Sequence, residues 1–291
     1  MLKGTYTALI TPFKGPHNKI DFDCLELLLE EQLKNNIEGV VVLGTTGETP
    51  TLLQEEQLSL IAFVVKKLKN QMDIIIGTGT NSTLTTIQQT KIAQDMGADK
   101  ALVVTPYYNK PTQEGIYKHF EALSSETTLP LIIYNIQSRT GRNIDTDTMS
   151  LIAELPHVVG IKEASGNIEQ MMDVLSKIHK PSFSVMSGDD ALTFPLLALG
   201  GHGVISVVSN LMPGLVKNMV DLCLKGDFEA ARLLHFRLLP LFKGAFLESN
   251  PAPIKEAMNI RGLNVGGVRL PLCTVTNETR IKLHGILGAL L

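Results

Sequence analysis

The stretch that decides the fold reads Val158-Val159-Gly160-Ile161-Lys162-Glu163. An apolar run without polar alternation is typical of a parallel strand that is buried on both faces, and here the run ends in two charged residues. Val- and Ile-rich runs of this kind recur at intervals of roughly 20 to 35 residues, each followed by turn residues and a stretch of helical periodicity. The repeat predicts a chain of βα units.

The βα units extend over most of the sequence. Eight of them predict an α/β fold of the (β/α)8, or TIM-barrel, type, and a doubly wound open sheet is the alternative. The expected strands are Tyr6–Ile10, Gly39–Leu43, Asp73–Ile76, Ala101–Thr105, Leu131–Asn135, Val158–Lys162, Ser184–Ser187 and Gly203–Val207.

Helical periodicity fills the segments between these runs, as in Phe22–Asn35 and Glu55–Leu68, and continues after the last strand in Pro213–Lys225. From Gly226 the pattern is helical only. We therefore expect a barrel over residues 1–225 and a C-terminal helical region over residues 226–291, joined by a tightly packed boundary. The expected C-terminal helices are Asp227–Leu234, Phe236–Leu247, Pro253–Asn259 and Asn277–Leu291.

Composition narrows the class of partner. The 291 residues are 44% hydrophobic and carry a formal net charge of -3 without a long run of Lys or Arg, so neither nucleic acid nor a membrane surface is an expected partner. Cys24, Cys223 and Cys273 are too far apart for a CxxC motif, which argues against a disulfide framework and a cysteine-based zinc site. Pro12 precedes any long apolar run, which argues against a signal peptide. We expect a cytoplasmic enzyme that acts on a small molecule.

The polar residues that could carry chemistry follow the predicted strands. In a TIM barrel the carboxyl ends of the strands surround a shared mouth, where the active site lies. The sequences at these ends are Gly44-Thr45-Thr46-Gly47-Glu48, Thr105-Pro106-Tyr107-Tyr108-Asn109, Tyr134-Asn135, Lys162-Glu163, Ser187-Gly188-Asp189-Asp190 and Ile205-Ser206.

Lys162 is the candidate nucleophile. Its position at the end of an apolar strand would place the amine inside the rim of the barrel, where desolvation lowers the pKa of a lysine and frees its amine to attack a carbonyl carbon. A lysine that reaches water or pairs with Glu163 is the alternative, and the strand by itself leaves both open.

Imine chemistry also needs a proton shuttle. Tyr134, one strand earlier and at the same height, offers a hydroxyl, and a chain through Thr45 and Tyr108 would lead the proton to solvent. Tyr134 is equally suited to fill a layer of the barrel interior. Thr45 and Thr46 are equally suited to a turn between two glycines.

Two features suit carboxylate binding. The Gly44–Gly47 loop exposes backbone N–H groups, and Arg139 offers a bidentate guanidinium, although a solvated loop arginine is the alternative. Neither this loop nor Gly77–Asn81 has a nucleotide-binding spacing. Asp189-Asp190 has no His or Glu at ligand spacing, so we expect turn or helix-capping aspartates and no metal.

Together these motifs resemble those of the dihydrodipicolinate synthase family, within the pyruvate-dependent class I aldolases. The resemblance covers nearly the whole chain. It rests on the strand-end sequences above and on Ser138-Arg139-Thr140-Gly141, Gly160-Ile161-Lys162-Glu163-Ala164, Gly201-His202-Gly203-Val204-Ile205-Ser206 and Asn250-Pro251-Ala252-Pro253-Ile254-Lys255.

The resemblance implies a reaction: condensation of pyruvate with aspartate 4-semialdehyde to 4-hydroxy-tetrahydrodipicolinate, the entry step to diaminopimelate and lysine, without an external cofactor. It implies that Lys162 forms the pyruvate imine, that Tyr134 gives and takes protons, and that Thr45 completes a relay with Tyr108 of a neighbouring subunit. Members of the family are commonly homotetramers built from tight dimers.

The resemblance also implies the substrate-binding residues. Thr46, Gly188 and the Ile205 backbone would hold pyruvate, and Arg139 would bind the carboxylate of the semialdehyde.

A departure from the family concerns feedback regulation. In lysine-inhibited members the effector pocket contains histidines and a glutamate, whereas the matching positions here are Gln54, Gln57 and Thr85; Asn81 and Tyr107 still match. Without the carboxylate that pairs with an ammonium, we expect weak or absent inhibition by lysine.

Two other functions remain as alternatives. A pyruvate-dependent aldolase for N-acetylneuraminate or a 2-keto-3-deoxy sugar acid would share the lysine and the tyrosine, although Thr45, Tyr108 and Arg139 together favour the synthase. An inactive barrel that senses a keto acid is the second alternative, and the complete set of candidate catalytic residues argues against it.

Overall fold

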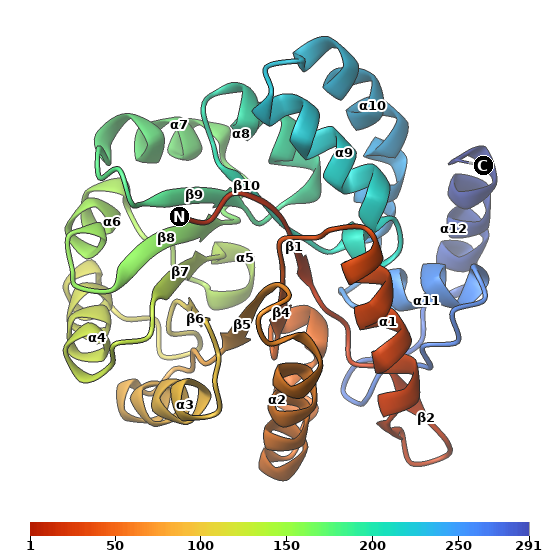
Figure 1. Cartoon of the computed structure of the whole chain (residues 1–291), viewed down its shortest axis with the longest axis horizontal. Helices are drawn as coiled ribbons and strands as arrows, with labels where there is room; N and C mark the ends of the chain where they lie inside the picture. Colours follow the sequence, from red (N-terminus) through yellow and green to blue (C-terminus); the bar gives the residue numbers. More distant parts are fainter. Residues whose placement is uncertain (291) are drawn as a thin grey trace.

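Eight parallel strands close into a barrel in the computed structural model, which describes residues 1–290 (Figure 1). β1 closes it by pairing with β10 on one side and with β4 on the other. This confirms the predicted TIM barrel and excludes the open sheet. The barrel strands are β1 (Gly4–Ala8), β4 (Gly39–Val42), β5 (Asp73–Gly77), β6 (Lys100–Val104), β7 (Leu131–Asn135), β8 (Val158–Glu163), β9 (Ser184–Ser187) and β10 (Gly203–Ser206).

Helices surround the barrel, and polar caps fix where several of them begin. The Asp21 carboxylate accepts the Cys24 N–H at 3.1 Å, and the Asn167 side-chain oxygen accepts the Glu169 N–H at 2.9 Å. The surrounding helices are α1 (Phe22–Lys34), α2 (Gln54–Leu68), α3 (Thr83–Asp95), α4 (Gln113–Glu126), α6 (Thr146–Ala153), α7 (Ile168–Lys177), α8 (Thr193–Ala198) and α9 (Pro213–Leu224).

Short elements occupy the loops at the carboxyl ends of the strands. They are η1 (Thr45–Gly47) and η2 (Thr49–Thr51) after β4, α5 (Gln137–Thr140) after β7, η3 (Asp190–Leu192) after β9 and η4 (Val208–Asn210) after β10. The antiparallel pair β2 (Phe13–Lys14) and β3 (Lys19–Ile20), which was not predicted, lies in the loop after β1.

The strands bury both of their faces. One apolar cluster fills the barrel interior and includes Val41, Ile132, Tyr134 and Ile205. A larger cluster joins the outer faces of the strands to the helices. Burial on both sides explains why the strands are continuous apolar runs in the sequence.

Most predicted boundaries are within one residue of those in the structure, and two predictions are wrong by more than that. The first strand was expected at Tyr6–Ile10 but begins at Gly4, because pairing with β10 starts there, and it ends at Ala8, after which the Ile10 N–H donates to the Asn210 side chain. The expected helices Asp227–Leu234 and Phe236–Leu247 are one helix, α10 (Phe228–Gly244). The buried His235 between them stacks on Phe194 at 5.4 Å and so continues the apolar face of α10.

The remaining C-terminal helices are α11 (Ala252–Ile260) and α12 (Asn277–Leu290); the predicted last residue, Leu291, lies outside the described residues. In Figure 1 the C-terminal helices lie on one side of the barrel, beyond α9 and α1. One apolar cluster runs across Lys225, from Val204 and Val216 to Leu238 and Leu283. The division into residues 1–225 and 226–291 stays a prediction.

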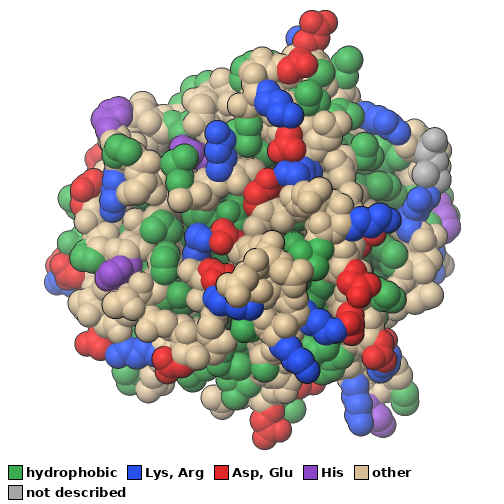
Figure 2. Space-filling view, viewed as in Figure 1, with side chains coloured by type: hydrophobic (Ala, Val, Ile, Leu, Met, Phe, Trp, Pro, Cys, Tyr) green, Lys and Arg blue, Asp and Glu red, His purple; other side chains and the backbone are tan. Residues whose placement is uncertain are grey.

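Side chains of both charge signs are interspersed over the face shown in Figure 2, with hydrophobic side chains between them. Among residues 1–290, no helix has the length and apolar character that crossing a membrane requires.

Candidate active site

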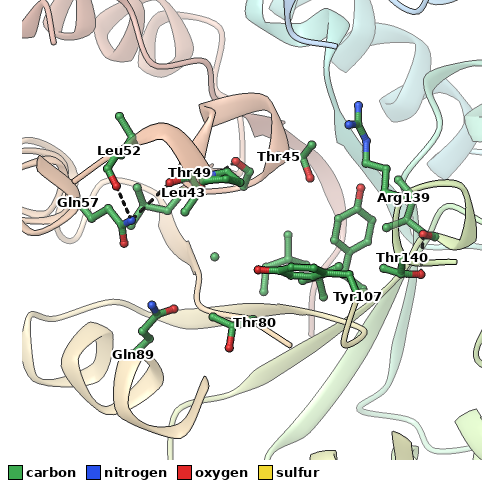
Figure 3. Close-up of a pocket in the computed structure, with 18 residues that line it drawn as sticks. Leu43, Thr45, Thr49, Leu52, Gln57, Thr80, Gln89, Tyr107, Arg139 and Thr140 are labelled. Atoms are coloured by element: carbon green, nitrogen blue, oxygen red, sulfur yellow. Dashed lines mark hydrogen bonds between the residues drawn. The ribbon is translucent and has the colours of Figure 1, made fainter. Parts of the chain in front are cut away.

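A cavity of about 410 Å³ opens at the carboxyl ends of the strands (Figure 3). The loop after β4 contributes Thr45, the end of β7 contributes Tyr134, and α5 contributes Arg139; Tyr107 follows β6. Three of the predicted catalytic and substrate-binding residues therefore line one cavity.

Lys162 lies beside Tyr134, which lines this cavity. In the parallel register of β7 and β8, Tyr134 is the partner of Lys162, so both side chains point to the same side of the sheet, into the barrel. The Lys162 amine lies 4.3 Å from the centre of the Tyr134 ring, and Lys162 is only 5% exposed. This geometry contradicts the alternative of a strand-end lysine that reaches water or pairs with Glu163.

Burial changes the acidity of both groups. It lowers the pKa of the Lys162 amine to about 8; Asp190 opposes this effect and Arg139 adds to it. Burial also raises the pKa of the Tyr134 phenol to about 12, although Arg139 and the Thr45 hydroxyl act in the opposite direction. Near neutral pH the site therefore holds a lysine that loses its proton easily beside a tyrosine that keeps its proton.

Gly188 makes room for Lys162. A Cβ at this position would lie 3.0 Å from Cγ and Cε of Lys162 and 2.7 Å from the Cβ of Ala164. A larger residue at position 188, directly after β9, would clash with Ala164 and crowd the Lys162 side chain, so this position favours a glycine.

Asn250 connects the two sides of the mouth. Its side-chain N–H donates to the Thr46 hydroxyl at 2.9 Å, and its backbone carbonyl accepts from the Arg139 guanidinium at 3.2 Å. Because Thr46 accepts this bond, its own proton stays available to a ligand. No role for Asn250 is predictable from the sequence, since nothing local to residue 250 signals a contact with residue 46.

Asp190 holds the end of β10, where Ile205 lies. Its carboxylate accepts from the Ser206 hydroxyl and from the backbone N–H groups of Val207 and Val208, at 2.9 and 3.2 Å for the latter two. Burial raises the pKa of the Asp190 carboxyl to about 6. Asp189 caps η3 through the Ala191 N–H, as the capping interpretation predicted. Within residues 1–290, no three His, Cys, Asp or Glu side chains come together as a potential metal site.

The predicted residues Thr46, Lys162, Gly188 and Ile205 do not line the cavity themselves, and neither does Tyr108. Tyr108 is 87% exposed, with a left-handed backbone φ of 71°, whereas its neighbour Tyr107 lines the cavity. The Tyr108 phenol therefore faces outward from the chain.

The five candidate effector residues do not share one cavity. Gln54, Gln57 and Thr85 line a second cavity of about 310 Å³ between α2 and α3. Gln57 also lines the first cavity, where its side chain donates to the Leu52 carbonyl at 3.1 Å (Figure 3). Asn81 and Tyr107 do not line the second cavity.

A closed parallel barrel with polar side chains gathered at the carboxyl ends of its strands defines a TIM-barrel enzyme. The family model of the dihydrodipicolinate synthetase family matches residues 1–290. The chain belongs to this family.

Individual relatives support the family assignment. The 4-hydroxy-tetrahydrodipicolinate synthase of Protochlamydia amoebophila is 50% identical, over 99% of this chain and 97% of its own. The dihydrodipicolinate synthase structure from Thermotoga maritima is 41% identical, covers all of both chains and has a TM-score of 0.97. The structure from Cyanidioschyzon merolae, described with lysine bound, is 38% identical, covers 99% and 98%, and has a TM-score of 0.95.

Proposed function

We propose that this enzyme condenses pyruvate with aspartate 4-semialdehyde to 4-hydroxy-tetrahydrodipicolinate, through an imine on Lys162. Membership of the dihydrodipicolinate synthetase family, whose relatives carry this synthase name, supports the reaction. The reaction belongs to the biosynthesis of diaminopimelate and lysine. The imine chemistry needs no external cofactor, because the lysine itself activates the keto acid.

The burial of the Lys162 amine is the main observation that supports the proposal. With a pKa of about 8, roughly a quarter of the amines are neutral at a pH of about 7.5, against about 0.1% for an unperturbed lysine. The neutral amine attacks the C2 carbonyl of pyruvate, and loss of water gives the imine. Loss of a proton from the methyl carbon then gives an enamine, whose carbon attacks the aldehyde.

Tyr134 is the proton donor and acceptor in these reaction steps. Its phenol adjoins the Lys162 amine and, because its pKa is raised, remains protonated until a step requires the proton. Thr45 lies next in the relay. Tyr108 of a neighbouring subunit completes it, which is consistent with its outward position in this chain.

Two sets of residues hold the two substrates. Thr46, Gly188 and the backbone at Ile205 bind pyruvate; Thr46 has its hydroxyl proton available for the carboxylate. Arg139, exposed at the mouth, binds the carboxylate of the semialdehyde and so selects an aldehyde with an acidic group.

Assembly, location and regulation complete the proposal. The enzyme is a cytoplasmic homotetramer built as a dimer of dimers, in which Tyr108 crosses an interface. Gln54, Gln57 and Thr85 line a cavity that offers amides and a hydroxyl, so an effector ammonium would lack a carboxylate partner there. Together with Asn81 and Tyr107 they form at most a weak lysine site.

Borohydride trapping tests the proposal. The enzyme is incubated with pyruvate, reduced, digested and mapped by mass spectrometry, with the Lys162→Arg variant as a matched control that keeps the positive charge. We expect the adduct at Lys162 in the wild type and none at residue 162 in the variant. An adduct elsewhere, or none, contradicts the proposal. Faster turnover with sugar aldehydes than with aspartate 4-semialdehyde would overturn the choice of second substrate.

A further inference from the structure

A buried ion pair joins the C-terminal helical region to the loop after β4. The Lys255 amine, on α11, donates to Glu48 Oε1 at 2.7 Å and to the Gly267 carbonyl at 2.6 Å. The two side chains are 2% and 0% exposed, and the amine lies 4.1 Å from the centre of the Phe13 ring. Apolar side chains of similar volume often give equal or greater stability, so a buried pair calls for a reason beyond stability.

The second oxygen of Glu48 is also held by the C-terminal region. The Arg269 N–H donates to Glu48 Oε2 at 2.8 Å. The Arg269 guanidinium in turn contacts both carboxylate oxygens of Glu56 at 2.7 Å and the Asn18 carbonyl. Residues 255 and 269 therefore fix the Glu48 carboxylate from two directions.

The backbone conformation at Glu48 has to be stabilised by contacts of this kind. Its φ of 57° and ψ of 32° are left-handed, a conformation that a residue with a Cβ adopts only at a cost. Glu48 directly follows η1, and its N–H donates to the Thr45 carbonyl at 3.1 Å. A shift of Glu48 would therefore move the turn that carries Thr45 and Thr46.

We propose that Glu48 and Lys255 are positioning residues of the active site. Their ion pair fixes the Thr45–Gly47 turn and so places Thr45 and Thr46 against the bound keto acid. The inference rests on the proposed function of that turn. It makes the C-terminal helical region part of the pyruvate-binding apparatus as well as of the apolar core.

The Lys255→Met variant tests this inference, because methionine is similar in length and lacks the charge. The measured quantity is the pyruvate concentration that gives half-maximal borohydride trapping at Lys162. We expect it to rise between about 10-fold and 100-fold, while saturating pyruvate still gives the adduct at Lys162. An unchanged half-saturation concentration would overturn the inference. Absence of the adduct in the wild type would instead overturn the proposed function.

A double variant separates positioning from stability. Lys255→Met leaves the buried Glu48 carboxylate without its cationic partner and is expected to lower the melting temperature. Glu48→Gln combined with Lys255→Met removes both charges and is expected to restore much of the melting temperature. If the pair positions the turn, the half-saturation concentration stays raised in the double variant. Its return to the wild-type value together with the melting temperature would contradict the inference.

Arg280→Met provides the matched control. It breaks the 2.6 Å pair between Arg280 and Glu256, which joins α12 to α11 without touching the turn. We expect the wild-type half-saturation concentration in this variant. An increase equal to that of Lys255→Met would mean that any loosening of the C-terminal helices has the same effect, and the specific role of the ion pair would be refuted.

Discussion

Imine formation at Lys162 should follow the titration of one amine near pH 8. In the proposed mechanism the neutral amine is the nucleophile, and burial lowers the pKa of Lys162 from 10.5 to about 8. The neutral fraction is then about 1% at a pH of about 6 and about one half at a pH of about 8. We therefore expect the rate at low pyruvate to rise about 50-fold between these two values and to level off above a pH of about 9.

The assay has to keep the reduction step independent of the test pH. The enzyme is mixed with pyruvate at each pH for a short interval and then quenched into borohydride under one fixed alkaline condition, and intact mass gives the trapped fraction. Lys162→Arg supplies the background from other amines. An unperturbed lysine would continue to gain about tenfold in rate per pH unit up to a pH of about 10, and that result would refute the effect of burial.

Three further predictions concern Tyr134, the stability cost of Lys162 and inhibition by lysine. Tyr134→Phe should lower kcat by about 10²- to 10⁴-fold while saturating pyruvate still gives the trapped adduct; wild-type kcat would exclude Tyr134 as proton donor. The lowered pKa of Lys162 reduces the free energy of unfolding by about 3 kcal/mol below pH 8, where the amine is charged in both the folded and the unfolded chain. Lys162→Met should therefore have a melting temperature several degrees higher at neutral pH, and the difference should shrink as the pH approaches 10.5. Lysine at low millimolar concentration should inhibit turnover weakly or not at all, and a sharp inhibition curve would contradict the interpretation of Gln54, Gln57 and Thr85.

The strands and most of the site were predictable because their determinants are local. A parallel strand buried on both faces has to be a continuous apolar run, so β7 and β8 begin where the sequence places them and differ by at most one residue at their ends. Closure of the barrel then brings the strand ends together, which is why Thr45, Tyr134 and Arg139 share one cavity.

The contacts that hold these residues were not predictable from the sequence. Asn250 reaches Thr46 across 204 positions, and Lys255 reaches Glu48 across 207, without any local pattern that marks the partner. The continuity of α10 was missed for the same reason, because it depends on a contact that the local sequence does not show. His235 breaks the apolar pattern in the sequence, yet the helix continues through it, because the ring stacks on Phe194 of α8.

The acidity of Lys162 is a consequence of strand register. Beyond the irregularity near Val159, the β8 side chains alternate between the barrel interior and the helices, and the pairing of Tyr134 with Lys162 assigns the amine to the interior. A slip of one residue would turn the amine toward the helices and remove the Tyr134 ring from it. The apolar packing that builds the strand also desolvates the lysine amine and lowers its pKa, so the proposed nucleophile depends on the fold as much as on its own side chain.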